Sequence, residues 1–296
     1  MVINAWSNYM IAGPLSVCEG PAVFHSTRKL DKRAWQSYHG SMNMYELIAP
    51  YYDLEHAGYQ DDVDLYLNYA LAVGSPVLEI GCGSGRLLEP LAQRGIEVVG
   101  VDSSPAMLAR ARAHLQERSV LKQAELIEAD ARALHLDRRF RLAFVALNSF
   151  AQFATRQEQR AVLAAIHEHL LPGGTLLLDL PNADIRRYQQ AEGQLFHQGV
   201  WTDERQHAIV SHFIAATHDQ EARVLHLTHF YDIHPQAGPL SRIVVENELA
   251  LLSGGEVELL VESCGFQIGH LFGDYDLNPC ADSSPRLIVV ATRDTT

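Results

Sequence analysis

The stretch "VLEIGCGSGR", residues 77–86, decides the fold, together with "GIEVVGVD", residues 95–102. The first apolar run leads into closely spaced glycines, and the second ends on Asp102. Glycine lets a chain turn sharply and lets a ligand lie against the backbone. A carboxylate at the end of the next strand can accept both hydrogen bonds of a ribose diol. Together these features indicate a nucleoside ligand.

The glycine spacing argues against a dinucleotide. The dinucleotide fingerprint is G-x-G-x-x-G, whereas here Gly81 and Gly83 are followed by Arg86 at the position of the third expected glycine. That third glycine allows the helix and strand to pack closely around a pyrophosphate. The absence of this glycine makes an NAD-dependent dehydrogenase a weaker interpretation of the sequence. That enzyme class stays an alternative.

Composition bounds the class of protein. The chain has 296 residues with 47% hydrophobic and 20% charged, enough for one large domain or for a domain with an insertion. Its formal charge of -13 repels nucleic acid and anionic lipid, so we expect neither as a partner. No apolar run reaches the roughly 20 residues that span a bilayer.

The cysteines predict a reducing compartment. The four are far apart, without the close pairs of a zinc site or a dense disulfide framework. We therefore expect a cytoplasmic protein without a metal site. Residues 1–41 show no sustained helical or strand period, and we expect a poorly ordered, dispensable extension before Met42 or Met44.

From Met44 onward the pattern alternates between helix and strand. Apolar spacing predicts helices over 44–56 and 60–73, another from Ser104, and one over 155–171. Short apolar runs predict buried strands at 77–80, 97–101, 124–128, 142–147 and 175–180. Repeated strand–helix–strand units require a parallel sheet with helices on both faces. The predicted fold class is therefore α/β, Rossmann-like and doubly wound.

The rhythm changes after Pro181. Consecutive strand-like runs at 206–217, 222–233 and 242–251 predict an antiparallel β insertion over 183–249. We expect this insertion to cover the active site or to pair two copies as a homodimer. A helix near 255–263 precedes a strand from Phe266 and a final strand at 285–293, which can form an antiparallel hairpin at the sheet edge. The result is a mostly parallel seven-stranded sheet closed by one antiparallel strand. Residues 42–182 and 250–296 then form one cofactor-binding domain.

A further acid extends the ligand pattern. Asp130 follows the third predicted strand, at the edge where open α/β sheets bind ligands. Its carboxylate can accept a hydrogen bond from an adenine amino group, or it can simply cap a turn. In series with Glu79 and Asp102, the ligand interpretation is favoured.

These residues resemble the class I S-adenosylmethionine-dependent methyltransferases. The resemblance runs from about 44 to 293 and is most specific over residues 77–112, with "EADA" at 128–131 and "HLLPGGTLLLDL" at 169–180 in the expected places. It implies that S-adenosylmethionine is the cofactor. It also implies that the glycine turn lies under the methionyl part, that Asp102 holds the ribose, and that Asp130 frames the adenine.

The resemblance also assigns other site residues. The segment "ALNSF", residues 146–150, matches the end of the fourth strand, which faces the sulfonium and the substrate. The helix at 44–56 resembles the amino-terminal lid of N-methyltransferases that act on sugar amines and glycine, in which the match of Tyr52 approaches the cofactor. Predicted cofactor-binding residues are Tyr52, Glu79, Gly81, Cys82, Gly83, Gly85, Arg86, Asp102, Ser103, Asp130, Ala131, Leu147 and Asn148. Predicted catalytic residues are Tyr52, Asn148 and His229, and predicted substrate contacts are Tyr51, Phe150, Gln152, His229 and Tyr231.

Two of these assignments carry alternatives. Arg86 either pairs with the cofactor carboxylate or caps the sheet edge. The insertion holds seven histidines, but His226 and His229 point to opposite faces of a strand and cannot easily share a metal. We expect most of these histidines to be surface groups, with His229 beside Tyr231 at the substrate cavity.

The predicted reaction is methylation of a small molecule. A sulfonium methyl is already electrophilic, so the protein need only align an attacking lone pair and exclude water. An amine can be made neutral by burial, whereas a hydroxyl needs a base or a metal. We therefore expect N-methylation by direct in-line transfer. The alternatives are an O- or C-methyltransferase of the same fold and a non-catalytic protein that binds S-adenosylmethionine.

Overall fold

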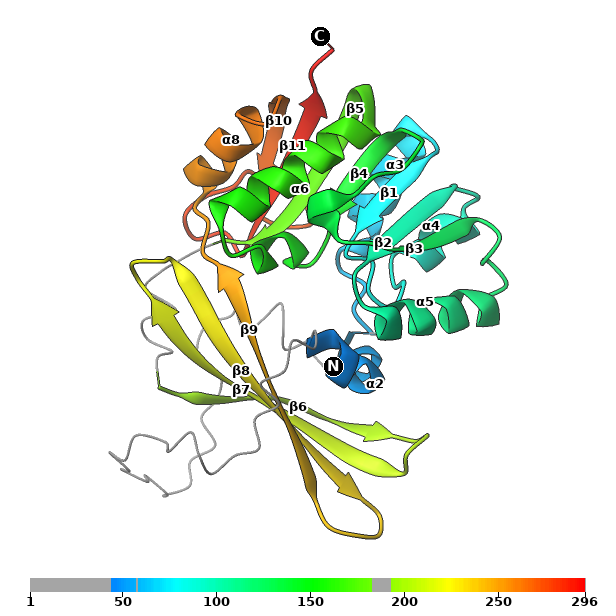
Figure 1. Ribbon diagram of the computed structural model, residues 1–296, viewed down its shortest axis with the longest axis vertical. Coiled ribbons are helices and arrows are strands. Elements are labelled where there is room, and N and C mark those ends of the chain that lie inside the picture. Colours follow the sequence, from blue (N-terminus) through cyan, green and yellow to red (C-terminus); the bar gives the residue numbers. More distant parts are fainter. Residues whose placement is uncertain (1–43, 57, 183–192, 296) are drawn as a thin grey trace.

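The computed structural model describes residues 44–56, 58–182 and 193–295 (Figure 1). The expected extension at residues 1–41, and the start of the functional chain near Met42, lie outside the described residues.

A seven-stranded sheet forms the upper part of the molecule in Figure 1. Its strands are β1 (Val77–Ile80), β2 (Val98–Asp102), β3 (Ala124–Glu128), β4 (Phe140–Val145), β5 (Leu170–Pro181), β10 (Phe266–Phe272) and β11 (Arg286–Arg293). Their order across the sheet is β10-β11-β5-β4-β1-β2-β3. The pairs among β1 to β5 are parallel, and β11 runs antiparallel to both of its neighbours. The doubly wound, mostly parallel fold class is confirmed.

Local signals explain where the helices begin. The helices are α2 (Met44–His56), α3 (Val63–Val73), α4 (Leu88–Gln93), α5 (Pro105–Glu117), α6 (Arg156–His169) and α8 (Gly254–Glu262), with 3-10 turns η1 (Ala131–Ala133) and η2 (Ser149–Gln152). The Ser104 hydroxyl accepts from the amide of Met107 and starts α5, and Thr155 forms a capping box with Glu158 at the start of α6.

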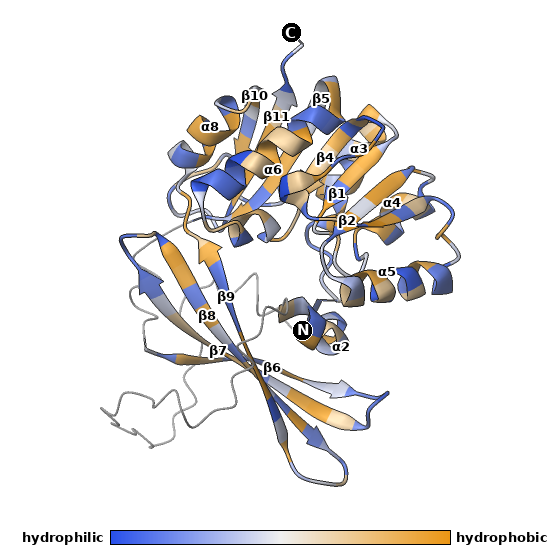
Figure 2. Cartoon of the chain, in the orientation of Figure 1, coloured by the Kyte–Doolittle hydropathy of each residue, from blue (hydrophilic) through white to orange (hydrophobic). Residues whose placement is uncertain are grey.

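Both faces of the seven-stranded sheet are covered. Val77 and Val98 belong to one buried apolar cluster, whereas their neighbours Leu78 and Val99 belong to the other. Consecutive strand residues point to opposite faces, so each strand is apolar on both sides. Figure 2 shows these strands as largely hydrophobic, while α5 and α6 alternate hydrophobic and hydrophilic residues along their length.

A second sheet follows β5 in the chain. It consists of β6 (Leu195–Asp203), β7 (Ala208–Asp219), β8 (Val224–Pro235) and β9 (Ser241–Ala250), antiparallel and in sequential order. The sequence predicted the last three strands but missed β6. A register shift between His197 and Gly199 breaks its alternation, and its apolar residues Leu195 and Val200 are exposed at the sheet edge.

Helix α2 lies between this second sheet and the seven-stranded one (Figure 1). Ile48 and Tyr51 of α2 form a buried cluster with Val210, Tyr231 and Val245 of the second sheet. Tyr51 stacks on Tyr231 with ring centroids 5.9 Å apart. Apolar packing on the second sheet therefore holds the helix. Its other face points toward the carboxyl edge of the seven-stranded sheet.

Candidate active site

Two adjacent cavities lie at the carboxyl ends of β1, β2 and β4. The larger has a volume of about 260 Å³ and the smaller of about 60 Å³. They share a wall made by Tyr45, Tyr52 and Gln152. Of the predicted site residues, the larger cavity is lined by Tyr52, Gly81, Gly83, Asp102, Ser103, Asp130, Ala131 and Gln152, and the smaller by Tyr52, Leu147, Asn148, Gln152 and Tyr231.

The glycine turn leaves its backbone bare toward the larger cavity. Gly81, Gly83 and Gly85 all have positive φ, at 73°, 53° and 82°. A Cβ on Gly83 would stand 3.3 Å from the Met107 side chain, which forms part of the same cavity wall. A side chain here would be strained and would also narrow the cavity.

Asp102 ties this turn to the start of α5. One carboxylate oxygen accepts from the Gly83 amide at 2.8 Å, and the other accepts from the Ser104 amide at 2.9 Å. Burial raises the pKa of Asp102 above its ordinary value, and these amide hydrogen bonds oppose that shift. Because each carboxylate oxygen has two lone pairs, both oxygens can also accept a ribose hydroxyl. The residue thus has a structural role in addition to the predicted binding role.

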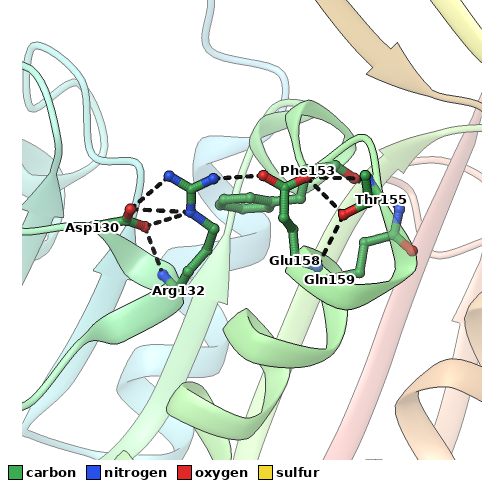
Figure 3. A network of polar contacts seen from close by, with 6 residues as sticks. All are labelled: Asp130, Arg132, Phe153, Thr155, Glu158 and Gln159. Carbon is green, nitrogen blue, oxygen red and sulfur yellow. Dashed lines mark hydrogen bonds and ion pairs between the residues drawn. The ribbon is translucent and has the colours of Figure 1, made fainter.

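Asp130 belongs to a chain of polar contacts at the mouth of the larger cavity (Figure 3). Its carboxylate accepts from the Arg132 amide at 2.9 Å and caps η1, as the alternative interpretation expected. The Arg132 guanidinium pairs with the same carboxylate and reaches Glu158 at 2.5 Å. The side-chain hydrogen bond from Arg132 holds the pKa of Asp130 below its ordinary value. An adenine amino group would therefore share this carboxylate with Arg132.

Four predicted cofactor residues, Glu79, Cys82, Gly85 and Arg86, lie outside the walls of both cavities. Arg86 forms a two-bond ion pair with buried Asp62, at 2.7 and 2.6 Å, and so attaches the start of α3 to the glycine turn. The Cys82 side chain packs against Gly100 in the core. Glu79 is 3% exposed, and burial holds its pKa well above the ordinary value. In this structure the side chains of Arg86, Cys82 and Glu79 pack on the side of the glycine turn away from both cavities.

Tyr45 is a wall residue that the sequence did not single out. Its hydroxyl accepts a hydrogen bond of 2.6 Å from the Gln152 side chain, which closes the wall between the cavities. Burial, then the charge of Asp102, raises the pKa of Tyr45 to about 12. Tyr52 stacks on His56 with centroids 4.1 Å apart, and burial also raises the pKa of Tyr52. Both phenols are therefore neutral hydrogen-bonding groups at neutral pH.

The wall after β4 has an unusual backbone. Leu147 and Asn148 adopt positive φ of 44° and 66°, a strained conformation for residues with side chains. Asp179 holds this turn, because its carboxylate accepts from the Leu147 amide at 3.2 Å and its carbonyl accepts from the Asn148 amide at 3.1 Å. The Asn148 side-chain oxygen is buried and has no hydrogen-bond partner among the described residues. Because Asn148 lines the smaller cavity, a bound donor that reaches this covered oxygen would satisfy it.

The support behind that wall is a buried ion pair. Arg286 is 2% exposed and donates from Nε to Asp179, which is fully buried, at 2.8 Å. Tyr66 and Tyr275 also donate to Asp179, at 3.2 and 2.8 Å. Sequence reasoning missed this group, because Asp179 and Arg286 stand 107 positions apart and each lies within an apolar run.

The predicted substrate contacts are divided by the structure. Gln152 and Tyr231 lie on the wall of the smaller cavity. Phe150 is fully buried in the core, and Tyr51 faces the second sheet. His229 is fully buried and hydrogen bonds to Asn247, which itself lines the cavity. The physical reasons differ: the 3-10 turn η2 directs Phe150 into the core, whereas the pairing of β8 with β9 sets Asn247 between His229 and the cavity.

No group of three or more His, Cys, Asp or Glu side chains is placed to hold a metal ion in the part of the chain that the structure describes. None of the described helices is long and apolar enough to cross a membrane.

Known proteins were then compared with the chain. Residues 77–174 match a family model for a methyltransferase domain. A cypemycin N-terminal methyltransferase from Streptomyces sp. is 34% identical over 120 residues, which is 40% of this chain and 46% of that protein. A ubiquinone biosynthesis O-methyltransferase from Pseudomonas aeruginosa is 33% identical over 115 residues, 39% of this chain and 48% of that protein. The chain therefore spans less than half the length of each of these relatives.

A solved structure covers more of the chain. The sugar N-methyltransferase KedS8 from Streptoalloteichus sp. aligns with a TM-score of 0.69 at 20% identity, over 88% of this chain and 97% of that one. At 20% identity, this similarity shows a shared fold and nothing finer. The matched region of the family model contains the glycine turn, Asp102 and Asp130.

Proposed function

Because residues 77–174 form a class I S-adenosylmethionine-dependent methyltransferase domain, we propose that the chain methylates the nitrogen of a small-molecule amine. The observation that supports this most directly is the pair of cavities that share a wall at Tyr45, Tyr52 and Gln152. The larger cavity suits a nucleoside, and the smaller, at about 60 Å³, has room for the reacting amine of an acceptor.

The residues present fit the cofactor. The bare glycine turn and the spare lone pairs of Asp102 suit a ribose, and Met107, Ala131 and Phe153 give the larger cavity apolar walls for a purine. When bound, S-adenosylmethionine supplies a methyl group on a positively charged sulfur. The aromatic rings of Tyr45 and Tyr52 at the shared wall are suited to such a cation.

The chain's own contribution is alignment and exclusion of water. Tyr45, Gln152 and Tyr52 close the wall, and the strained turn presents Asn148 to the acceptor. Holding two reactants in an attack geometry can supply roughly 7–11 kcal/mol of a barrier. No covalent intermediate with the protein is required for such a transfer.

Asn148 favours nitrogen as the acceptor atom. A neutral amine can donate an N–H to the unpaired Asn148 oxygen while its lone pair attacks the methyl group. A hydroxyl has a single hydrogen, which it must give up to a base as it attacks. Among the described residues, no carboxylate lines the smaller cavity.

O-methylation is the second candidate, and His56 is the observation that favours it. His56 lines the smaller cavity, and its Nδ1 lies 2.9 Å from the Tyr52 carbonyl oxygen. With its proton on Nδ1, this imidazole presents an unprotonated Nε2. Burial lowers the pKa of His56, so the ring is neutral at neutral pH and can act as a base.

The experiment is a screen of acceptors with S-adenosylmethionine labelled on its methyl group. The panel pairs amines with matched hydroxyl compounds: glucosamine with glucose, and tyramine with phenol. N-methylated products that survive in His56→Ala support the proposal. Methyl transfer confined to hydroxyls, and lost in His56→Ala, would replace it with the O-methyltransferase. Binding without transfer to any member would leave a cofactor-binding protein.

A further inference from the structure

A line of polar side chains runs from α2 through the second sheet to the smaller cavity, with an ion pair at its first step and hydrogen bonds at the next two. Glu55 on α2 lies 3.1 Å from Nδ1 of His212 on β7. His212 Nε2 lies 3.0 Å from Nδ1 of His229 on β8. His229 Nε2 lies 2.9 Å from the side-chain oxygen of Asn247 on β9, and Asn247 lines the cavity.

The line is buried at every member but the last. Glu55 is 5% exposed, and His212 and His229 are fully buried. Tyr231, another wall residue, stacks on His212 with centroids 4.1 Å apart. Burying three ionisable side chains is costly unless their hydrogen bonds are satisfied. The methyl transfer described above gives Glu55 and His212 no task.

The contacts allow a count of protons. The two hydrogen bonds each need one hydrogen between their partners. The ion pair needs a hydrogen on His212 Nδ1, because a bare lone pair there would face the Glu55 carboxylate. When Asn247 offers its oxygen, the two rings must carry three hydrogens, which is one more than two neutral imidazoles hold. When Asn247 turns over and offers its NH₂, two ring hydrogens satisfy all three contacts. The orientation of one carboxamide is therefore coupled to the loss or gain of one proton.

We propose that Asn247 contacts the methyl acceptor, and that the chain Glu55–His212–His229 sets which end of its carboxamide faces the cavity. In the orientation of this structure the Asn247 oxygen faces His229, and the rings hold the extra proton. Loss of that proton turns the oxygen toward the cavity, where it accepts from an N–H. Binding of an amine therefore releases a proton from the buried line. This inference rests on the proposed function for the identity of the acceptor.

The electrostatics place the extra proton beside Glu55. Burial, then the charge of His212, lowers the pKa of His229 to about 4, so His229 is the neutral ring. Burial raises the pKa of Glu55, but hydrogen bonding and charge from His212 outweigh it and lower the pKa overall. The other titratable groups that face the line are His56, Tyr45 and Tyr52 on α2 and Tyr231 on β8.

The first test uses Asn247→Leu, with the panel member that gives the largest turnover as acceptor. We expect the KM for that acceptor to rise about 10-fold or more, with the KM for S-adenosylmethionine unchanged. His226→Gln is the matched control, because His226 and Glu248 form a similar pair, 3.1 Å apart, that is half-exposed on the same strands. An unchanged acceptor KM in a folded Asn247→Leu protein would overturn the contact.

The second test counts protons. The acceptor is titrated by calorimetry into protein saturated with S-adenosylhomocysteine, in two buffers of different ionisation enthalpy. Wild type and His226→Gln should release up to one proton more per site than Glu55→Gln, because only the first two keep the buried pair. Equal proton release in Glu55→Gln and wild type would overturn the role of the buried line.

A third measurement separates this inference from the proposed function. Nitrogen-15 spectra of the histidine rings, with S-adenosylhomocysteine bound, need no acceptor. We expect hydrogens on both nitrogens of His212 and on Nε2 alone of His229 at neutral pH, and a neutral His212 in Glu55→Gln. One hydrogen on each ring in both proteins would overturn the proton count. An absence of any methyl transfer would instead remove the proposed function while this result stands.

Discussion

The buried ion pair behind the cavity wall gives the sharpest prediction for stability. In Asp179→Asn the residue keeps one acceptor oxygen for the Leu147 amide and the tyrosine hydroxyls. The Arg286 guanidinium, 2% exposed, then loses its counter-charge. Removing one partner of a buried pair typically costs about 3–5 kcal/mol. At about 2–4 °C per kcal/mol for a domain of this size, the melting temperature should fall by about 6–20 °C.

The reciprocal variant, Arg286→Met, should lower the free energy of unfolding by less than Asp179→Asn does. In Arg286→Met the buried carboxylate of Asp179 still accepts from Tyr66, Tyr275 and the Leu147 amide. Asp232→Asn is the matched control, because it breaks another two-bond pair, with Arg242, whose side chain is 37% exposed. The Asp232 side chain is 10% exposed, but its guanidinium partner is open to water, so breaking this pair should cost near the upper end of the about 0.2–1 kcal/mol typical of exposed pairs.

Urea unfolding of the proteins without cofactor measures these differences at one temperature. The expected order of destabilisation is Asp179→Asn, then Arg286→Met, then Asp232→Asn. A cost for Asp179→Asn below about 1 kcal/mol, or equal to that of Asp232→Asn, would refute the reasoning from burial.

Three further predictions concern the site. Gly83→Ala should weaken S-adenosylhomocysteine binding about 10-fold by calorimetry, because its Cβ would narrow the larger cavity beside Met107; unchanged affinity would contradict this. The strain at φ 53° is present with and without ligand, so it should lower stability by about 1–2 kcal/mol. Stability should fall as pH drops from about 6.5 to about 4, because His229, with a folded-state pKa of about 4, resists a proton that the unfolded chain accepts. His229→Gln should flatten that slope in urea unfolding, and an equal slope would count against it. Arg132→Ala should change the melting temperature by less than about 2 °C and the cofactor affinity by less than about 3-fold, because its pair with Asp130 is exposed. A larger change in the melting temperature would show that the network in Figure 3 stabilises the fold.

Much of the fold followed from the sequence because its signals are local. The predicted helix at 44–56 has the same bounds in the structure. The strand at 77–80 and the capped start of α5 at Ser104 were likewise visible in short apolar runs and capping residues. The six-residue helix α4 went unpredicted, because so short an element shows less than two turns of helical period.

The site was less accessible to sequence reasoning where it depends on pairing between distant segments. The glycine turn and Asp102 belong to one strand–helix–strand unit, so their proximity was foreseeable. Glu55 and His212 come together only through the packing of α2 on the second sheet, and no spacing in the chain reveals it. Asn247 lines the cavity because of the register between β8 and β9, which a single strand pattern does not specify.

The most direct test is a calorimetric titration of S-adenosylmethionine into wild type and Asp102→Ala, with NAD as the control ligand. Two ribose hydrogen bonds to a carboxylate are worth about 1.5–3 kcal/mol each, so losing them should weaken binding at least about 100-fold. We predict one cofactor per wild-type chain, no binding of NAD, and that loss in a folded Asp102→Ala protein. A wild-type protein that ignores the cofactor, or a variant that binds it equally well, would contradict the account.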